Sequence, residues 1–209
     1  MKLNFRIAII SLGALLAASS QATIVWDFST VYAGQPVFST PGPWAELDIS
    51  NGANAGDVNF AIKNLMPFGS GNFLGELLLN TVGNPAGITL SNGVHASLGS
   101  ASENGTPDAG SRFDVDIKFP TGGGHLIPTN TPNVPVATWT LHQTGLTENS
   151  FLAFSTPSGQ NPPAEALLHL QGLANIGSTK AVPTTAPEPA SLAALGLGAI
   201  ALLRKKRTR

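Results

Sequence analysis

The chain has 209 residues, a length typical of one domain, and it contains no cysteine. A disulfide framework, a thiolate metal site and a cysteine nucleophile are therefore excluded. Between Thr23 and Ala186, four basic side chains stand against eleven acidic ones, a net charge of −7. We expect no nucleic-acid partner, because that binding needs clustered Lys and Arg.

The start of the chain has the three parts of a secretory signal peptide. Lys2 and Arg6 form a positive n-region, an apolar h-region follows, and Ser20-Gln21-Ala22 has the small residues of a cleavage site. We predict cleavage between Ala22 and Thr23, with the Sec export machinery and signal peptidase as partners. The alternative is an uncleaved anchor or a buried N-terminal helix, which the short h-region disfavours.

Alternating apolar and polar residues predict an all-β domain after the signal peptide. In residues 112–119, four apolar side chains alternate with four charged ones, so we predict Phe113, Val115, Ile117 and Phe119 in the core and a solvated opposite face. Related patterns predict further strands at residues 24–28, 44–49, 57–63, 73–79, 136–141, 150–154 and 166–170. Many short strands without a helical pattern are typical of an antiparallel β-sandwich, of which a jelly roll is one form.

Turn signals separate these strands. Asn-Gly pairs, which favour tight hairpin turns, occur at Asn51, Asn92 and Asn104. Two stretches rich in Gly, Ser, Asn or Pro, residues 99–110 and 121–135, are predicted to be loops.

The histidines are candidates for catalysis or metal binding, and they are His95, His125, His142 and His169. Their spacing fits no short metal motif, and the nucleophile motif G-x-S-x-G is absent. We interpret His142 and His169 as side chains satisfied within the fold. The sequence therefore predicts no catalytic residue and no cofactor.

Two acidic groups could bind a ligand. Asp114 and Asp116 share a strand face and suit glycoside hydrolysis or calcium, but the flanking cations favour a solvated face. An oxygen-rich turn suits Ca²⁺ and contains Asp48, Asn51, Asn54 and Asp57. Its spacing departs from the EF-hand, which favours a plain hairpin, so no metal is predicted and Asp48 and Asp57 are the metal candidates.

The tryptophans are candidates for a sugar-stacking platform, and they are Trp26, Trp44 and Trp139. Each lies within or at the start of a predicted strand. Core packing is the commoner role of tryptophan at such positions.

The chain ends in three parts with a fixed order. Pro187-Glu188-Pro189 cannot continue a helix or a sheet ladder. The run from Ala190 to Leu203 has no polar face and predicts a membrane segment, although a full span takes about 20 residues. The basic end consists of Arg204, Lys205, Lys206, Arg207 and Arg209. Clustered cations predict that this end stays in the cytoplasm.

These three parts together resemble the PEP-CTERM sorting signal of bacterial exported proteins, which a membrane-embedded exosortase recognises and cuts. Pro43-Trp44-Ala45 with Val58-Asn59-Phe60 is similar to the opening hairpin of such proteins, and residues 151–154 with 168–172 are similar to their closing strands. The resemblance implies a protein held briefly at the inner membrane and then released to the cell surface or to an exopolysaccharide-rich matrix. It implies no catalytic residue.

The predicted organisation is a signal peptide at 1–22, an exported β domain at 23–177, a linker at 178–186 and the sorting signal at 187–209. The leading hypothesis is a non-enzymatic surface or matrix protein. The alternatives are a carbohydrate- or calcium-binding surface module and, third, a secreted hydrolase using Asp114 or a histidine.

Overall fold

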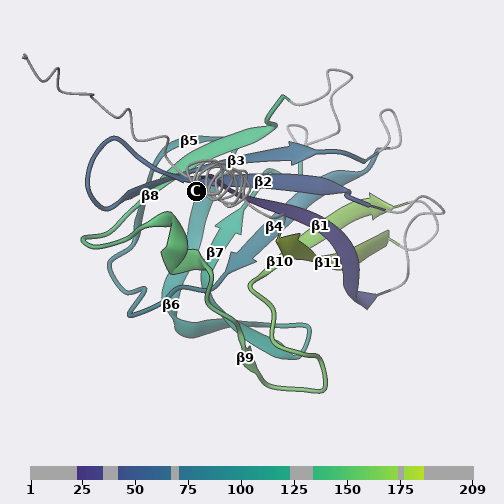
Figure 1. Ribbon diagram of the computed structural model, residues 1–209. Helices are drawn as coiled ribbons and strands as arrows, with labels where there is room; N and C mark the ends of the chain where they lie inside the picture. Colours follow the sequence, from purple (N-terminus) through teal and green to yellow (C-terminus); the bar gives the residue numbers. More distant parts are fainter. Residues whose placement is uncertain (1–22, 35–41, 67–70, 123–133, 174–176, 186–209) are drawn as a thin grey trace, which may run out of the picture.

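The structure is a computed structural model that describes residues 23–34, 42–66, 71–122, 134–173 and 177–185 (Figure 1). Its elements in chain order are β1 (Thr23–Gly34), β2 (Ala45–Asn51), β3 (Asp57–Asn64), β4 (Phe73–Leu79), β5 (Thr89–Val94), β6 (Ser97–Asp108), β7 (Ser111–Lys118), β8 (Ala137–His142), the 3₁₀ helix η1 (Glu148–Phe151), β9 (Thr156–Pro157), β10 (Ala166–Leu173) and β11 (Gly177–Thr185). Within these ranges no helix is long and apolar enough to cross a membrane. The predicted signal peptide and membrane segment lie outside them.

The described strands form one antiparallel sheet in the order β5-β8-β3-β2-β1-β11-β10-β4-β7-β6, with β9 paired to β7. The first and last strands are therefore neighbours in the middle of the sheet, and Figure 1 shows β1 curving from β2 toward β10 and β11. The prediction of an all-β antiparallel domain is confirmed. The sandwich is not confirmed, because these strands are connected in a single sheet.

The main core lies on one face of this sheet, as the alternation predicts. In β2 and β3, Leu47, Ile49 and Ile62 are fully buried and the residues between them are not. At its centre the rings of Phe60 and Trp139 stack with centroids 5.2 Å apart. All three tryptophans are buried, so their role is core packing and not a sugar platform.

Phe113 is buried, but it does not belong to the main core. It packs with Leu78 and Leu167 in a second cluster on the opposite face, since Leu77 and Leu79 on either side of Leu78 face the main core. The distal part of the β6–β7 hairpin covers this outer face, where Lys180 on β11 pairs with Asp108 at the end of β6. The predicted solvated face of β7 is therefore wrong for this part of the sheet.

Several predicted boundaries need correction. Residues 99–110 lie largely in β6, where Asn104 has φ of 52° and the register shifts between Ala101 and Thr106. The Asn-Gly pair there forms a bulge within a strand and not a hairpin turn. Asn92 behaves in the same way in β5, with φ of 51°.

Two other segments adopt structure that the sequence did not predict. Residues 150–154, predicted to be a strand, overlap the 3₁₀ helix η1 and an irregular segment. The predicted linker at 178–186 is wrong, because β11 ends only at Thr185 and pairs with both β1 and β10. Its alternate residues Thr179 and Ala181 are buried, so tertiary contacts determine this strand despite its linker-like composition.

We predict that a domain ending at Leu173 loses its cooperative unfolding transition. Removing β11 takes out a central strand and leaves β1 and β10 with unpaired edges. Urea denaturation followed by tryptophan fluorescence measures this, with the same domain ending at Thr185 as the control. Equal transitions for both lengths would mean that residues 177–185 are a dispensable linker.

Candidate functional site

The start of the first described strand and the end of the last one lie on the same side of the domain. β1 and β11 are antiparallel neighbours, with Trp26 opposite Thr185 and Asp27 opposite Thr184. Thr23, at the start of β1, and Thr185, at the end of β11, therefore lie at the same end of adjacent strands (Figure 1). Segments attached to these two residues emerge side by side from the domain.

The acidic turn does not bring its two candidate carboxylates together. Asp57 Oδ2 accepts a hydrogen bond from Asn54 at 2.8 Å, and its Oδ1 lies 2.6 Å from His142 Nδ1. Asp48 instead forms an ion pair with Lys63 at 3.1 Å. Asp48 lies opposite Ala61, four residues along β3 from Asp57, which separates the two metal candidates by about 13 Å. No group of three or more metal-binding side chains occurs among the residues that the structure describes.

Asp114 is a buried connection between two loops. Only 8% of its surface is exposed. Its Oδ2 accepts a hydrogen bond from the backbone N–H of Thr81 at 3.0 Å, and its Oδ1 accepts one from Asn104 at 2.8 Å. One carboxylate thus fixes the loop after β4 against the bulge in β6.

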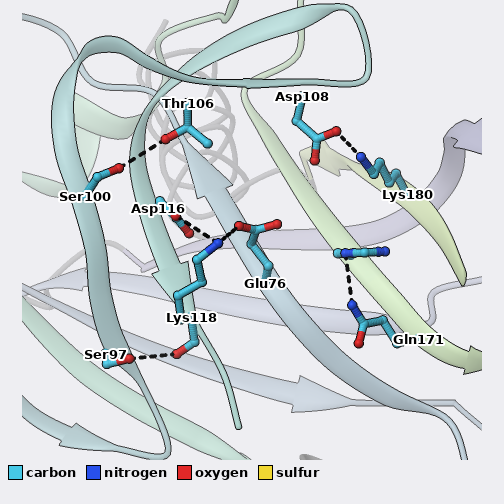
Figure 2. Close-up of polar contacts among 10 residues, drawn as sticks. Glu76, Ser97, Ser100, Thr106, Asp108, Asp116, Lys118, Gln171 and Lys180 are labelled. Carbon is cyan, nitrogen blue, oxygen red and sulfur yellow. Dashed lines mark hydrogen bonds and ion pairs between the residues drawn. The ribbon is translucent and has the colours of Figure 1, made fainter. Parts of the chain in front are cut away.

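Asp116 has different partners. It is also buried, and its Oδ2 lies 3.0 Å from Lys118 Nζ, which also pairs with Glu76 (Figure 2). Burial raises the pKa of Asp116, and the Lys118 ammonium opposes this only in part. Asp114 and Asp116 therefore bind separate groups and do not meet as the paired carboxylates of a hydrolase.

A row of polar side chains crosses the outer face of the sheet. Lys118 lies opposite Glu76, Glu76 opposite His169, and His169 opposite Lys180, which pairs with Asp108 (Figure 2). The ion pairs at the two ends of this row, Lys118 with Glu76 and Lys180 with Asp108, support the packing of these four strands, β7, β4, β10 and β11. The sequence placed several of these residues on strands but gave no sign that the four strands would align.

The described histidines are held within the fold. His142 contacts Asp57, His169 Nδ1 lies 3.1 Å from Gln171 Nε2, and His95 Nδ1 lies 3.1 Å from the Val136 carbonyl oxygen. The interpretation of His142 and His169 as satisfied side chains is confirmed. His125 lies outside the described residues.

A polar pocket of about 340 Å³ opens beside Asp114. Its lining includes Thr81 and Asn84 from the loop after β4, Glu103 from β6, and Phe154 from the segment between η1 and β9. Of the lining residues only Asp114 was a candidate from sequence. The exposed aromatic ring of Phe154 is the feature that most suggests a binding site here. The sequence could not show it, because exposure cannot be read from the sequence.

The end of the chain is similar to a known protein-sorting motif. Residues 185–207 match the family model described as the PEP-CTERM protein-sorting motif. The chain carries a PEP-CTERM sorting motif. This confirms the resemblance of the tail and implies exosortase-dependent export, through a membrane-anchored intermediate, to the cell surface. No curated protein and no solved structure matches the chain.

In this chain, the sorting motif begins where the described fold ends. Thr185 is both the last residue of β11 and the first residue matched by the motif. The predicted processing residues Pro187, Glu188 and Pro189 and the predicted basic cluster from Arg204 to Arg209 lie outside the described residues. They begin only two residues beyond a central strand of the sheet.

We predict that Asp114→Ala lowers the free energy of unfolding by about 2–4 kcal/mol, because it removes the acceptor of two backbone N–H groups. Glu103→Ala is the control, since Glu103 is exposed, and should change stability by less than about 0.5 kcal/mol. Urea denaturation measures both. Equal, small effects would mean that Asp114 is a surface residue.

We predict that His169 makes the protein less stable in mild acid. Burial lowers the pKa of His169 below 6.5, so as the pH falls through this value the unfolded chain takes up a proton that the folded protein does not. Stability should fall between pH 7.5 and pH 5, and His169→Gln should reduce this slope. Thermal unfolding across the pH range measures it, and an unchanged slope in the variant would contradict the prediction.

Proposed function

We propose that this protein is a non-enzymatic surface or matrix protein of the exopolysaccharide-rich cell exterior. Its signal peptide is removed after Ala22, and the β domain folds outside the cytoplasm. The apolar tail holds it in the inner membrane until exosortase cuts near Pro187-Glu188-Pro189. The mature domain then leaves the membrane.

This proposal depends on the arrangement of β1 and β11, in which the start of β1 lies beside the end of β11. Because Thr23 and Thr185 lie at the same end of paired strands, the signal peptide and the sorting tail can enter one membrane from one edge of the domain. The chain then needs no long connection across the domain to bring the sorting tail to the membrane that holds the signal peptide. Exits at opposite ends of the sheet would instead require a long connection.

Electrostatics support the same orientation. The basic cluster, which includes Arg204 and Lys205, stays in the cytoplasm by the positive-inside rule. The β domain has a net charge of −7, the sum of four basic and eleven acidic side chains between Thr23 and Ala186, and lies on the other side. The apolar run between them provides a short span.

The junction leaves little room between the domain and the membrane. Four residues lie between Thr185 and Ala190, and the five Cα-to-Cα steps across them span at most about 18 Å in a fully extended chain. Pro187 and Pro189 prevent β11 from extending its ladder and prevent the apolar segment from extending its helix into this junction. A stretch whose prolines disfavour hydrogen-bonded secondary structure suits a protease.

The lack of catalysis is also part of the proposal. Among the described residues, the candidate carboxylates Asp48, Asp57, Asp114 and Asp116 all contact protein groups, which are ion-pair partners or hydrogen-bond donors. Paired carboxylates of a glycosidase would instead converge in a cleft. A surface protein without catalysis acts by binding other molecules or by contributing to the extracellular matrix.

We predict that replacing Pro187-Glu188-Pro189 with three alanines leaves uncut protein in the inner membrane, because the junction can then become helical. Cell fractionation with mass spectrometry of the C-terminus measures this in a host that has the exosortase. The wild-type mature protein should lack the apolar run and the basic cluster.

The control exchanges Leu195 with Ala199, which keeps the apolar length of the run and should leave processing normal. Full-length protein ending at Arg209 on the surface of wild-type cells would contradict the proposal. Normal release of the alanine variant would do so as well.

A further inference from the structure

We propose that the pocket beside Asp114 binds a neutral carbohydrate. It is lined by the loop after β4, the bulge of β6, Asp114 on β7 and the segment around Phe154. Its volume of about 340 Å³ lies at the lower end of the range for small-ligand sites, which suits one or two sugar units. If the protein has the proposed surface role, this pocket identifies the class of ligand that it binds there.

The hydroxyl of Thr81 is the first reason to infer a ligand. Thr81 is 7% exposed and lines the pocket. Its backbone N–H is used by Asp114, but its Oγ1 is buried and has no hydrogen-bond partner among the described residues. Buried hydroxyls in native proteins nearly always have a partner. Rotation of the Thr81 side chain toward the pocket would let a ligand hydroxyl supply it.

The polar lining matches the chemistry of a sugar. Glu103 is an acceptor, and Asn84 uses its Oδ1 to accept from the Ala86 N–H at 2.9 Å, which leaves its amide group as a donor. Sugar hydroxyls both donate and accept. The lining contains two carboxylates, and Arg112, which donates to the carbonyl oxygen of the lining residue Asn104 at 3.3 Å, is not part of it, so the lining itself repels a phosphate or an acidic sugar.

Apolar side chains around the pocket match the other half of a sugar, its C–H faces. Phe154 is 64% exposed, and Val82, between the lining residues Thr81 and Gly83, is 70% exposed. A backbone hydrogen bond of 2.7 Å from Val82 to Ser150 joins the two segments that carry them. Exposed apolar groups beside a concave polar surface indicate a binding site that a ligand with apolar faces would cover.

A cation fits the pocket less well. Each oxygen of Asp114 already accepts a backbone hydrogen bond, and Glu103 is the other carboxylate in the lining. Calcium takes six to eight oxygen ligands and binds tightly where several carboxylates converge. The exposed ring of Phe154 would also have no role at a cation site.

The test is binding of the full chain to an array of neutral and acidic oligosaccharides, followed by calorimetry with the best neutral one. The detergent must lack a sugar headgroup. We expect a neutral oligosaccharide to bind, and we expect Phe154→Ala and Thr81→Val each to weaken binding about tenfold, the effect of one good contact. Thr81→Val should not reduce stability, because its Oγ1 has no partner in the described fold.

Two control variants complete the design. Val94→Ala removes another exposed apolar side chain away from the pocket and should leave binding unchanged. Thr140→Val removes a buried hydroxyl that donates to Asn59 at 2.9 Å, so it should lower stability without changing binding. Binding that Thr81→Val and Phe154→Ala leave unchanged would overturn the proposal.

Two further outcomes would also overturn it. One is that no neutral oligosaccharide binds, and the other is that Ca²⁺ binds in place of sugar and requires Glu103. The proposal rests on the proposed export only for its biological setting, because binding does not require processing. Normal export without sugar binding would refute the pocket alone, and sugar binding without exosortase cleavage would refute the export proposal alone.

Discussion

The pairing of β1 with β11 holds the two halves of the sheet together. On one side β1 continues into β2, β3, β8 and β5, and on the other β11 continues into β10, β4, β7 and β6. The ladder runs from Trp26 opposite Thr185 to Gly34 opposite Thr179. Because the first and last described strands form it, the sheet cannot close until residue 185 is available, and contacts of such high sequence separation form slowly.

A second set of contacts fixes the outer face of this sheet. The distal β6–β7 hairpin packs Phe113 on Leu78 and Leu167, and the ion pair of Asp108 with Lys180 holds the hairpin to β11. The hydroxyls of Tyr32 and Ser111, 2.6 Å apart, connect it to β1. In an exported domain without cysteine, these buried polar and apolar contacts take the place of covalent cross-links.

The sequence predicted β2 and β3 within a residue or two, because period-two alternation is a local signal. The bounds of β4 also agree with the prediction, although this strand is buried on both faces and its signal is a short apolar run and not an alternation. The prediction failed for β6 and β11, whose Gly, Ser and Pro content resembles a loop and whose pairing comes from distant strands. The prediction that Asp114 and Asp116 lie on a solvated face was also wrong. Alternation shows which residues share a face of a strand, but it does not show that a hairpin folds over that face.

The pocket and the C-terminal end of β11 lie on the same side of the sheet. Leu79 at the end of β4 pairs with Ala166 at the start of β10, and β10 runs antiparallel to β11, so the loop carrying Thr81 and the end of β11 at Thr185 point the same way. Two inter-strand spacings separate these strands, about 10 Å. With at most about 18 Å of chain between Thr185 and the apolar run, the proposed topology turns this side toward the membrane. Cleavage at the junction would then do two things together, because it frees the domain and gives large glycans access to the pocket.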